Sequence, residues 1–218
     1  MIRTLSILGI ALIPMTSLAA PQQDLKNLFS LKDVEVVSVS KNPEKAFDAA
    51  SAIFVISQGD IQRSGATSIP EVLRLVPGLE VARMDSSKWA ITSRGFNRQF
   101  VNKMLVLIDG RSVYTPLFSG TYWDTQDTIL EDIERIEVIR GPGATLWGAN
   151  AVNGVINIIT KTASATQGTL ISGIYGNHEH GNLSTRYGGK IGEKAHYRVY
   201  SKYFKRAEAK TTDSDIGA

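Results

Sequence analysis

Residues 133–161 read IERIEVIRGPGATLWGANAVNGVINIITK, and this segment sets the expected architecture. Residues 135–140 alternate apolar and charged side chains, which is the period of a β-strand. Gly141–Gly143 ends that strand, because glycine permits unusual backbone angles and proline has no N–H to donate. A helix of one or two turns, a tight turn at Asn153–Gly154 and a β-branched strand over 155–160 are then expected.

A strand, a glycine turn and a short helix could also form a phosphate-binding loop. A P-loop ends in Gly-Lys-Ser/Thr, whereas residues 148–150 are Gly-Ala-Asn, and a dinucleotide fingerprint requires glycine where Leu146 stands. The connection to the next strand is also shorter than the dozen or so residues that a parallel crossover needs. The segment therefore favours packing over nucleotide binding.

Three motifs, in this order and at suitable spacing, resemble the plug domain of TonB-dependent outer-membrane receptors. They are RGF at 94–96, LVLIDGR at 105–111 and the whole of 133–161, so the resemblance covers about residues 34–161. Trp147 stands where many members of the family carry tyrosine, and an aromatic side chain is kept. The resemblance implies an α+β fold class: a small mixed-sheet plug domain with short helices, followed by antiparallel strands of an incomplete transmembrane β-barrel.

Composition sets wider bounds on the class of protein. With 218 residues, 43% of them hydrophobic, the chain can bury one core of ordinary size, and 21% charged residues is too few for a disordered tail. A net charge of +3, from lysines and arginines spread along the chain, does not indicate nucleic acid. The absence of cysteine from the sequence excludes disulfide frameworks, thiolate metal sites and a lipoprotein anchor.

Residues 1–20 have the pattern of a secretory signal peptide. Arg3 supplies the positive end, residues 5–13 the apolar middle, and Ser17–Ala19 the small-x-small cleavage pattern, with cleavage expected after Ala19. A membrane anchor is the alternative, but an anchor needs roughly 20 apolar residues and Pro14 interrupts this run. We expect the chain to be exported.

Residues 34–40, with sequence VEVVSVS, alternate like an exposed strand. Such a strand can pair edge to edge with a partner's sheet, where main-chain hydrogen bonds supply the affinity. The segment resembles the family's TonB box, which implies TonB as the partner; an ordinary first strand is the alternative. The residues predicted to couple to TonB are Val34, Glu35, Val36, Val37, Ser38, Val39 and Ser40.

A polar turn at residues 85–88, between two short strands, and an aromatic-rich loop over 111–128 are candidates for ligand contact. In the resembling family, plug loops that face outward help to bind the incoming ligand. Large aromatic side chains in a loop can also pack against a surrounding wall. The predicted ligand-binding residues are Asp85, Ser86, Ser87, Lys88, Tyr114, Phe118, Tyr122 and Trp123.

Arg94, Glu137 and Arg140 lie in or beside otherwise apolar strands, where a charge is costly unless it is paired. The resemblance implies that such plug charges meet charges on the inner wall of the barrel. A solvated strand face is the alternative.

Three helix starts are expected from capping patterns. Ser57 with Asp60 is a weak cap for a helix that Gly65 ends, whereas Ser68 with Glu71, and Thr128 with Glu131, have the spacing of capping boxes. The second helix carries Pro70 in its first turn and an apolar face of Ile69, Val72, Leu73 and Val76, so it is expected to pack on the core.

Residues 169–175, 183–190 and 195–206 are expected to form three strands with alternating side chains. Leu183, Thr185 and Tyr187 would face one way, and Ser184 and Arg186 the other. This pattern fits transmembrane barrel strands, with a soluble meander as the alternative. Barrels of the resembling family have roughly 22 strands, and an open edge in lipid is not viable, so a truncated receptor or a piece of one is expected.

Catalysis finds little support. His178 and His180 flank Glu179 in a turn, an arrangement more often solvated than metal-binding, and His196 lies in a strand. No serine has a nucleophile-elbow context, and the carboxylates of residues 131–137 spread over different faces. We expect no enzyme activity, no cofactor and no metal site.

The expected function is that of a plug in a TonB-gated receptor of the cell outer membrane, for a scarce ligand such as a ferric siderophore. The partners implied are TonB with its inner-membrane energising complex, the ligand and outer-membrane lipid, with no nucleic acid. The expected regions are 1–19 (signal peptide), 20–42 (periplasmic lead), 43–162 (plug) and 163–218 (start of the barrel). The alternatives are a soluble periplasmic α+β binding or adhesion module and, more weakly, an exported hydrolase.

Overall fold

The computed structural model describes residues 35–38, 44–45, 52–95, 97–142 and 144–207. The predicted signal peptide, residues 1–19, lies outside the described residues, and so do Val34, Val39 and Ser40 of the predicted coupling segment. In the described ranges, no helix has both the length and the apolar character needed to cross a membrane.

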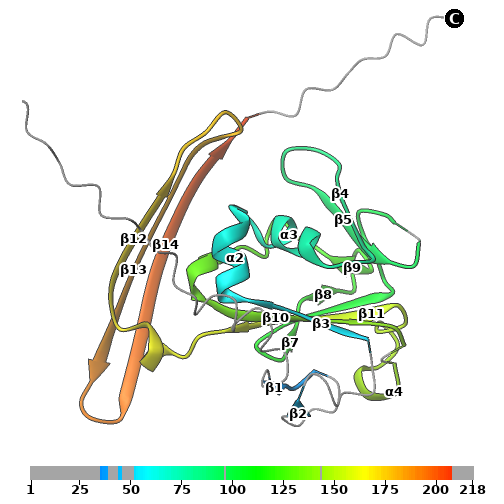
Figure 1. The fold of residues 1–218 in the computed structure, drawn as a ribbon, viewed down its shortest axis with the longest axis horizontal. Helices are drawn as coiled ribbons and strands as arrows, with labels where there is room; N and C mark the ends of the chain where they lie inside the picture. Colours follow the sequence, from blue (N-terminus) through cyan, green and yellow to red (C-terminus); the bar gives the residue numbers. More distant parts are fainter. Residues whose placement is uncertain (1–34, 39–43, 46–51, 96, 143, 208–218) are drawn as a thin grey trace, which may run out of the picture.

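A five-stranded mixed sheet forms the centre of the first domain (Figure 1). Its strands, in spatial order, are β3 (Ile53–Ser57), β10 (Ile133–Arg140), β11 (Gly154–Thr160), β6 (Met104–Ile108) and β7 (Arg111–Ser112). Strand β10 is antiparallel to both β3 and β11, while β11 is parallel to β6. The antiparallel β10–β11 pair agrees with a connection too short for a parallel crossover.

Alternation along β10 and β11 divides the sheet into two faces. Ile136 pairs with Ile158 and Val138 with Ile156, and these four side chains lie in the main hydrophobic cluster. Glu137 pairs with Asn157 between them, so its side chain points to the opposite face. The second face therefore carries one acidic residue amid apolar neighbours.

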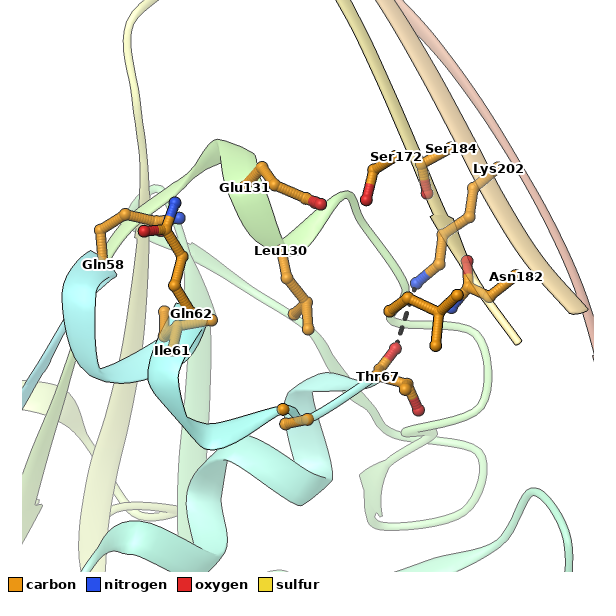
Figure 2. A pocket seen from close by; sticks show the side chains of 13 residues that line it. Gln58, Ile61, Gln62, Thr67, Leu130, Glu131, Ser172, Asn182, Ser184 and Lys202 are labelled. Atoms are coloured by element: carbon orange, nitrogen blue, oxygen red, sulfur yellow. Dashed lines mark hydrogen bonds between the residues drawn. The ribbon is translucent and has the colours of Figure 1, made fainter. Parts of the chain in front are cut away.

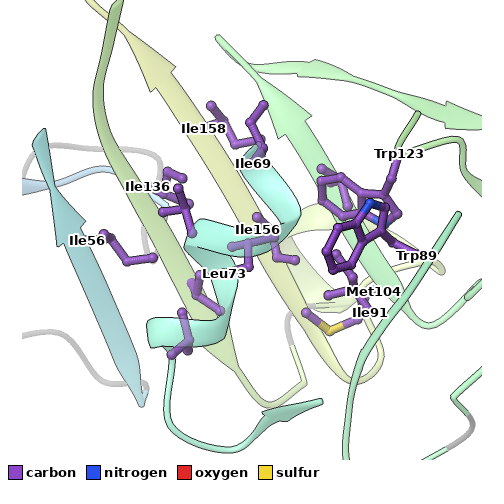
Figure 3. Close-up of a cluster of buried hydrophobic side chains, with 14 of the residues drawn as sticks. Ile56, Ile69, Leu73, Trp89, Ile91, Met104, Trp123, Ile136, Ile156 and Ile158 are labelled. Carbon is purple, nitrogen blue, oxygen red and sulfur yellow. The ribbon is translucent and has the colours of Figure 1, made fainter. Parts of the chain in front are cut away.

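Short helices cover the first face of the sheet. They are α2 (Gln58–Ser64), α3 (Ile69–Val72) and the 3₁₀ turn η2 (Leu73–Leu75). Ile69 and Leu73 pack into the cluster with Ile56, Ile136 and Ile156 (Figure 3). The apolar face predicted for this helix is confirmed, since Ile69, Val72, Leu73 and Val76 are all buried.

Only one of the three expected caps forms as predicted. Ser57 and Asp60 make a reciprocal capping box, and Gly65 ends α2 in the left-handed conformation. The Ser68 prediction is wrong: Glu71 accepts hydrogen bonds from Thr67, one residue earlier, and the Ser68 side chain caps nothing. The Thr128 prediction is also wrong, because only a single 3₁₀ turn, η3 (Leu130–Asp132), follows it.

The second face is covered by α4 (Ala144–Trp147) and by a two-stranded ribbon of β1 (Glu35–Val36) and β2 (Glu44–Lys45). In Figure 1 these elements lie on the side of the sheet opposite to α2 and α3. A smaller cluster that includes Leu105, Ile139 and Val155 packs there. The fold thus has three layers, with the mixed sheet in the middle.

Two small hairpins project from the same domain. They are β4 (Leu79–Arg83) with β5 (Trp89–Ser93), and β8 (Tyr114–Thr115) with β9 (Gly120–Thr121). The first encloses the predicted polar turn, and the second holds part of the aromatic-rich loop.

A separate antiparallel sheet follows the 3₁₀ turn η4 (Ala163–Thr166) and stands beside the first domain in Figure 1. Its strands are β12 (Gly168–Ile174), β13 (Glu179–Ile191) and β14 (Ala195–Arg206), here called the β12–β14 sheet. The predicted alternation is confirmed: Leu183 and Tyr187 are exposed, while Ser184 is buried against the first domain. The expected α+β fold class, a small mixed sheet with short helices followed by antiparallel strands that do not close, is thus confirmed.

Gly154 tests the close packing at the start of β11. A Cβ atom at this position would collide with the carbonyl oxygen of Ile139, whereas one at Gly173 in β12 would meet open space. We expect Gly154→Ala to lower the free energy of unfolding by about 1–3 kcal/mol through overpacking, and Gly173→Ala to change it little. Urea unfolding followed by tryptophan fluorescence measures this, because Trp89, Trp123 and Trp147 all lie in the first domain. Equal midpoints for the two variants would contradict the packing argument.

Candidate functional site

The β4–β5 turn is ordered by its own side chains. Asp85 Oδ1 accepts hydrogen bonds from the backbone N–H groups of Ser87 (2.8 Å) and Lys88 (2.7 Å), and Oδ2 lies 3.0 Å from Lys88 Nζ. The N–H groups of Ser87 and Lys88, together with the lysine ammonium, hold the pKa of Asp85 well below its usual range. The turn therefore presents a fixed arrangement of charges to the solvent.

An aromatic cluster lies close to this turn. The rings of Phe100, Phe118 and Tyr122 have centroids 5.1–5.3 Å apart, and Phe118 is 45% exposed. Hydrogen bonding to Asp85 is the main cause of a raised pKa for Lys88, and the nearby Tyr122 adds to it. The structure thus brings together two groups predicted separately from the sequence. Phe100 was missed, although it is a large aromatic residue in a loop, the same signal that identified Phe118.

Trp123 does not belong to this exposed surface. Trp123 is only 7% exposed and packs in the main core near Trp89 (Figure 3), which is the packing alternative for the loop aromatics. Tyr114 is half-buried in β8. Ligand contact therefore remains a prediction for Asp85, Ser86, Ser87, Lys88, Tyr114, Phe118 and Tyr122.

The described part of the predicted coupling segment, residues 35–38, docks on the second face of the sheet. Val36 and Ser38 are completely buried. Glu137 Oε2 accepts hydrogen bonds from the N–H groups of Val37 (3.1 Å) and Ser38 (2.9 Å) and from the Ser38 hydroxyl (2.6 Å). These contacts join parts of the chain about one hundred residues apart.

Glu137 was expected to meet the barrel wall, and the structure corrects this. Its side chain is fully buried under residues 37–38, and its other oxygen pairs with Arg135 Nε at 2.8 Å. The reason is the position of β10: it lies between β3 and β11, and the face to which Glu137 points is covered by the N-terminal segment.

The other two predicted plug–barrel charges are Arg94 and Arg140. Arg140 Nη1 donates a 2.6 Å hydrogen bond to the carbonyl oxygen of Pro77, which ties the end of β10 to the turn before β4. Arg94 is exposed, has a positive φ of 62°, and forms none of the ion pairs found among the described residues. Contact of these two arginines with a barrel wall stays a prediction.

Ion pairs that the sequence did not reveal join the first domain to the β12–β14 sheet. Asp132, whose side chain is 2% exposed, pairs with Arg186 and lies 3.5 Å from Arg198 Nε. Asp127 pairs with Lys202 at 2.7 Å. Alternation along β13 and β14 predicts which cationic side chains face inward. Their acidic partners could not be predicted, because they lie in the 127–132 segment, which has no repeating pattern.

A cavity of about 240 Å³ lies beside these ion pairs (Figure 2). Gln58, Gln62 and Thr67 line it from the first domain, and Asn182 and Lys202 line it from the sheet. Ile61, Leu130 and Ile174 also line it, so the cavity is mixed in character. It lies where the first domain meets the β12–β14 sheet.

In the described ranges, no three His, Cys, Asp or Glu side chains are grouped so that they could hold a metal ion. Two groups of the predicted site residues come together: Asp85–Lys88 near the solvent, and Val36–Ser38 around the buried Glu137.

The sequence was compared with models of protein families and with known proteins. A family model described as "TonB-dependent Receptor Plug Domain" matches residues 45–155, about half of the chain. The chain is 32% identical over 188 residues to a vitamin B12 transporter of Vibrio cholerae, and 32% identical over 163 residues to one of Vibrio vulnificus. These matches cover 86% and 73% of this chain but only 30% and 26% of the transporters, so the chain spans less than a third of their length.

Solved structures agree with the fold. A variant of the ferric enterobactin receptor of Pseudomonas aeruginosa superposes with a TM-score of 0.53 at 28% identity, over 73% of this chain and 25% of that one. The ferripyoverdine receptor of the outer membrane of the same organism gives a TM-score of 0.59 at 19% identity, over 79% and 22%. The second likeness bears on the fold alone.

The ion pairs of Asp132 provide a test of how the two parts are joined. We expect Asp132→Asn to lower the free energy of unfolding by about 3–5 kcal/mol, because it leaves two largely buried guanidinium groups without their anion. Glu131→Gln is the matched control, since Glu131 forms none of the ion pairs seen in the described ranges. Urea unfolding in detergent, followed by tryptophan fluorescence, measures both, and a loss for Glu131→Gln as large as for Asp132→Asn would count against the ion-pair account.

Proposed function

Because this chain belongs to the TonB-dependent receptor plug domain family, we propose that it forms the plug and the first barrel strands of a receptor in the cell outer membrane. The observation that carries the proposal is a plug-like mixed-sheet domain joined by ion pairs to a sheet that faces it with polar side chains. The regions of the chain are then 20–42 as periplasmic lead, 43–162 as plug and 163–218 as the start of the barrel, after a signal peptide at 1–19.

The β12–β14 sheet is suited to a lipid boundary. Its outward side chains include Ile171, Leu183, Tyr187, Val199 and Tyr203, each more than half exposed. Its inward side chains include Arg186, Arg198 and Lys202, which pair with the plug. Apolar residues outward and polar residues inward, alternating along each strand, are the pattern of an outer-membrane barrel.

The partner proposed for the N-terminal segment is TonB, energised by its inner-membrane complex. An exposed strand such as residues 34–40 can add to the edge of a partner's sheet through main-chain hydrogen bonds. Since the energy would arrive through TonB, the chain needs no nucleotide site, in keeping with the absence of phosphate-binding motifs from residues 133–161.

The ligand proposed for the outward loops is a ferric siderophore. Phe118 and Tyr122 offer aromatic faces and Lys88 offers a cation, a combination that suits an anionic, aromatic-rich iron complex. The two Vibrio relatives named as vitamin B12 transporters make cobalamin the second candidate.

A soluble periplasmic binding module is the rival from another class. Cell fractionation separates the two: the receptor enters the outer membrane, whereas the module stays in the periplasmic fraction. Recovery of the whole protein in the soluble fraction would reject the receptor.

Ligand binding by the outward loops is tested with ferric enterobactin, ferripyoverdine and cyanocobalamin on isolated outer membranes. We expect one ferric siderophore to bind, and Phe118→Ala or Lys88→Ala to weaken it about tenfold, the usual effect of removing an anchoring side chain. Ile171→Ala, on the outward side of β12, is the control and should leave affinity unchanged. Tighter binding of cyanocobalamin than of either iron complex would assign the chain to cobalamin instead.

Coupling is tested by capture on the purified C-terminal domain of TonB. Replacement of residues 34–40 by a glycine-serine segment of equal length should abolish capture, because the strand's side chains are lost and glycine disfavours extended pairing. The same replacement at residues 22–28 should leave capture intact. Capture that survives loss of 34–40 would show that the segment is not the coupling site.

A further inference from the structure

We propose that Glu137 is a latch: its buried carboxylate holds residues 35–38 on the second face of the sheet and withholds them from a strand-pairing partner. The identity of that partner as TonB rests on the proposed function, whereas the latch itself rests on contacts within this chain.

The carboxylate is placed to bind this segment and little else. Glu137 is fully buried, and a single oxygen, Oε2, accepts three hydrogen bonds of 2.6–3.1 Å from Val37 and Ser38. Hydrogen bonds to a charged acceptor are about twice as strong as neutral ones. One side chain therefore contributes most of the polar attachment of the segment.

Ser38 is held through every polar group it has. Its N–H and hydroxyl donate to Glu137, its hydroxyl accepts from Asn157 Nδ2 at 2.9 Å, and its carbonyl oxygen accepts from Trp147 Nε1 at 2.8 Å. Asn157 lies directly opposite Glu137 on β11, and Trp147 lies on α4. The site is thus built from three elements around one serine.

Docking and partner binding compete for the same atoms. Strand addition to a partner requires free main-chain N–H groups. The N–H groups of Val37 and Ser38 both donate to Glu137, and Glu35–Val36 already pairs with Glu44–Lys45. A partner strand can therefore use this part of the segment only after it leaves Glu137.

The latch can open without leaving an isolated buried charge. Glu137 Oε1 lies 2.8 Å from Arg135 Nε, and Arg135 also pairs with the exposed Glu134 at 2.5 Å. When residues 37–38 depart, the carboxylate keeps its cation and one face becomes open to water. A buried carboxylate with no such partner would make release far more costly.

The test uses the absence of cysteine from the sequence. One variant, Val36→Cys, places a single thiol at a fully buried position of the segment. A second variant, Val106→Cys, places a single thiol in the main core, where it reports global unfolding. Each is combined with Glu137→Ala or with the matched control Glu134→Ala, which removes the other carboxylate of Arg135. Maleimide labelling rates are measured on the full chain in outer membranes without ligand.

Glu137→Ala should speed labelling of the segment thiol, introduced by Val36→Cys, by at least about tenfold, the equivalent of one charge-assisted hydrogen bond. The core thiol, introduced by Val106→Cys, should stay protected, and Glu134→Ala should change neither rate. If the core thiol also becomes reactive, Glu137→Ala has unfolded the domain, and Ser38→Ala is used in its place. Ser38→Ala removes only the hydroxyl contacts, so it should speed labelling of the segment thiol and leave the core thiol protected. Unchanged protection of the segment thiol in Glu137→Ala, or in Ser38→Ala where that variant decides, overturns the latch.

A second measurement keeps the latch distinct from the proposed function. Capture by the C-terminal domain of TonB is compared for the parent chain and Glu137→Ala. Faster labelling of the segment thiol without capture in either chain leaves the latch standing and rejects TonB as partner. Equal capture together with equal labelling keeps the coupling proposal and rejects the latch.

Discussion

The alternation of side chains along β10 is the constraint on which the other parts of the structure depend. β10 lies between β3 and β11, and both faces of the sheet are covered by other parts of the chain. Each of its side chains must therefore pack against whatever covers the face to which it points. Ile136 and Val138 meet the short helices, which explains why those helices need an apolar stripe. Glu137 meets the opposite face, where a charge is tolerated only with donors around it. The N-terminal segment supplies those donors, so the central strand fixes where the segment docks.

The chain uses two different kinds of attachment between its parts. The β12–β14 sheet is joined to the first domain by ion pairs from Asp127 and Asp132, reinforced by a hydrogen bond from Arg198 to the carbonyl oxygen of Lys161. Residues 35–38 are joined mainly through backbone groups to one carboxylate. Ion pairs from separate residues secure the sheet, whereas one carboxylate accepts three of the hydrogen bonds that hold the segment, and Asn157 and Trp147 donate the others to Ser38. The first attachment suits a permanent junction and the second suits a reversible one.

Much of the fold could be predicted because its signals are local. Gly141–Gly143 and the β-branched run over 155–160 define β10, α4 and β11 from neighbouring residues alone. The failures are equally informative. At Ser68 the capping pattern was wrong, since Glu71 accepts hydrogen bonds from Thr67, four residues earlier, and not from Ser68. The partners of Glu137 and Asp132 lie about 100 and 54 residues away, and no local pattern records such pairings.

The edge position of β3 bears on how tension would travel through the molecule. β3 is the first strand of the mixed sheet after residues 35–45 along the chain, and among the described strands β10 is its only neighbour in that sheet. Once residues 35–38 and the β1–β2 pair have separated, a force applied from the N-terminal side would load that one ladder before any other ladder of the mixed sheet. The strands β10, β11 and β6 are each flanked on both sides, and β10 begins directly after Asp132. The fold therefore offers one strand that can be peeled away singly, next to three that resist as a unit.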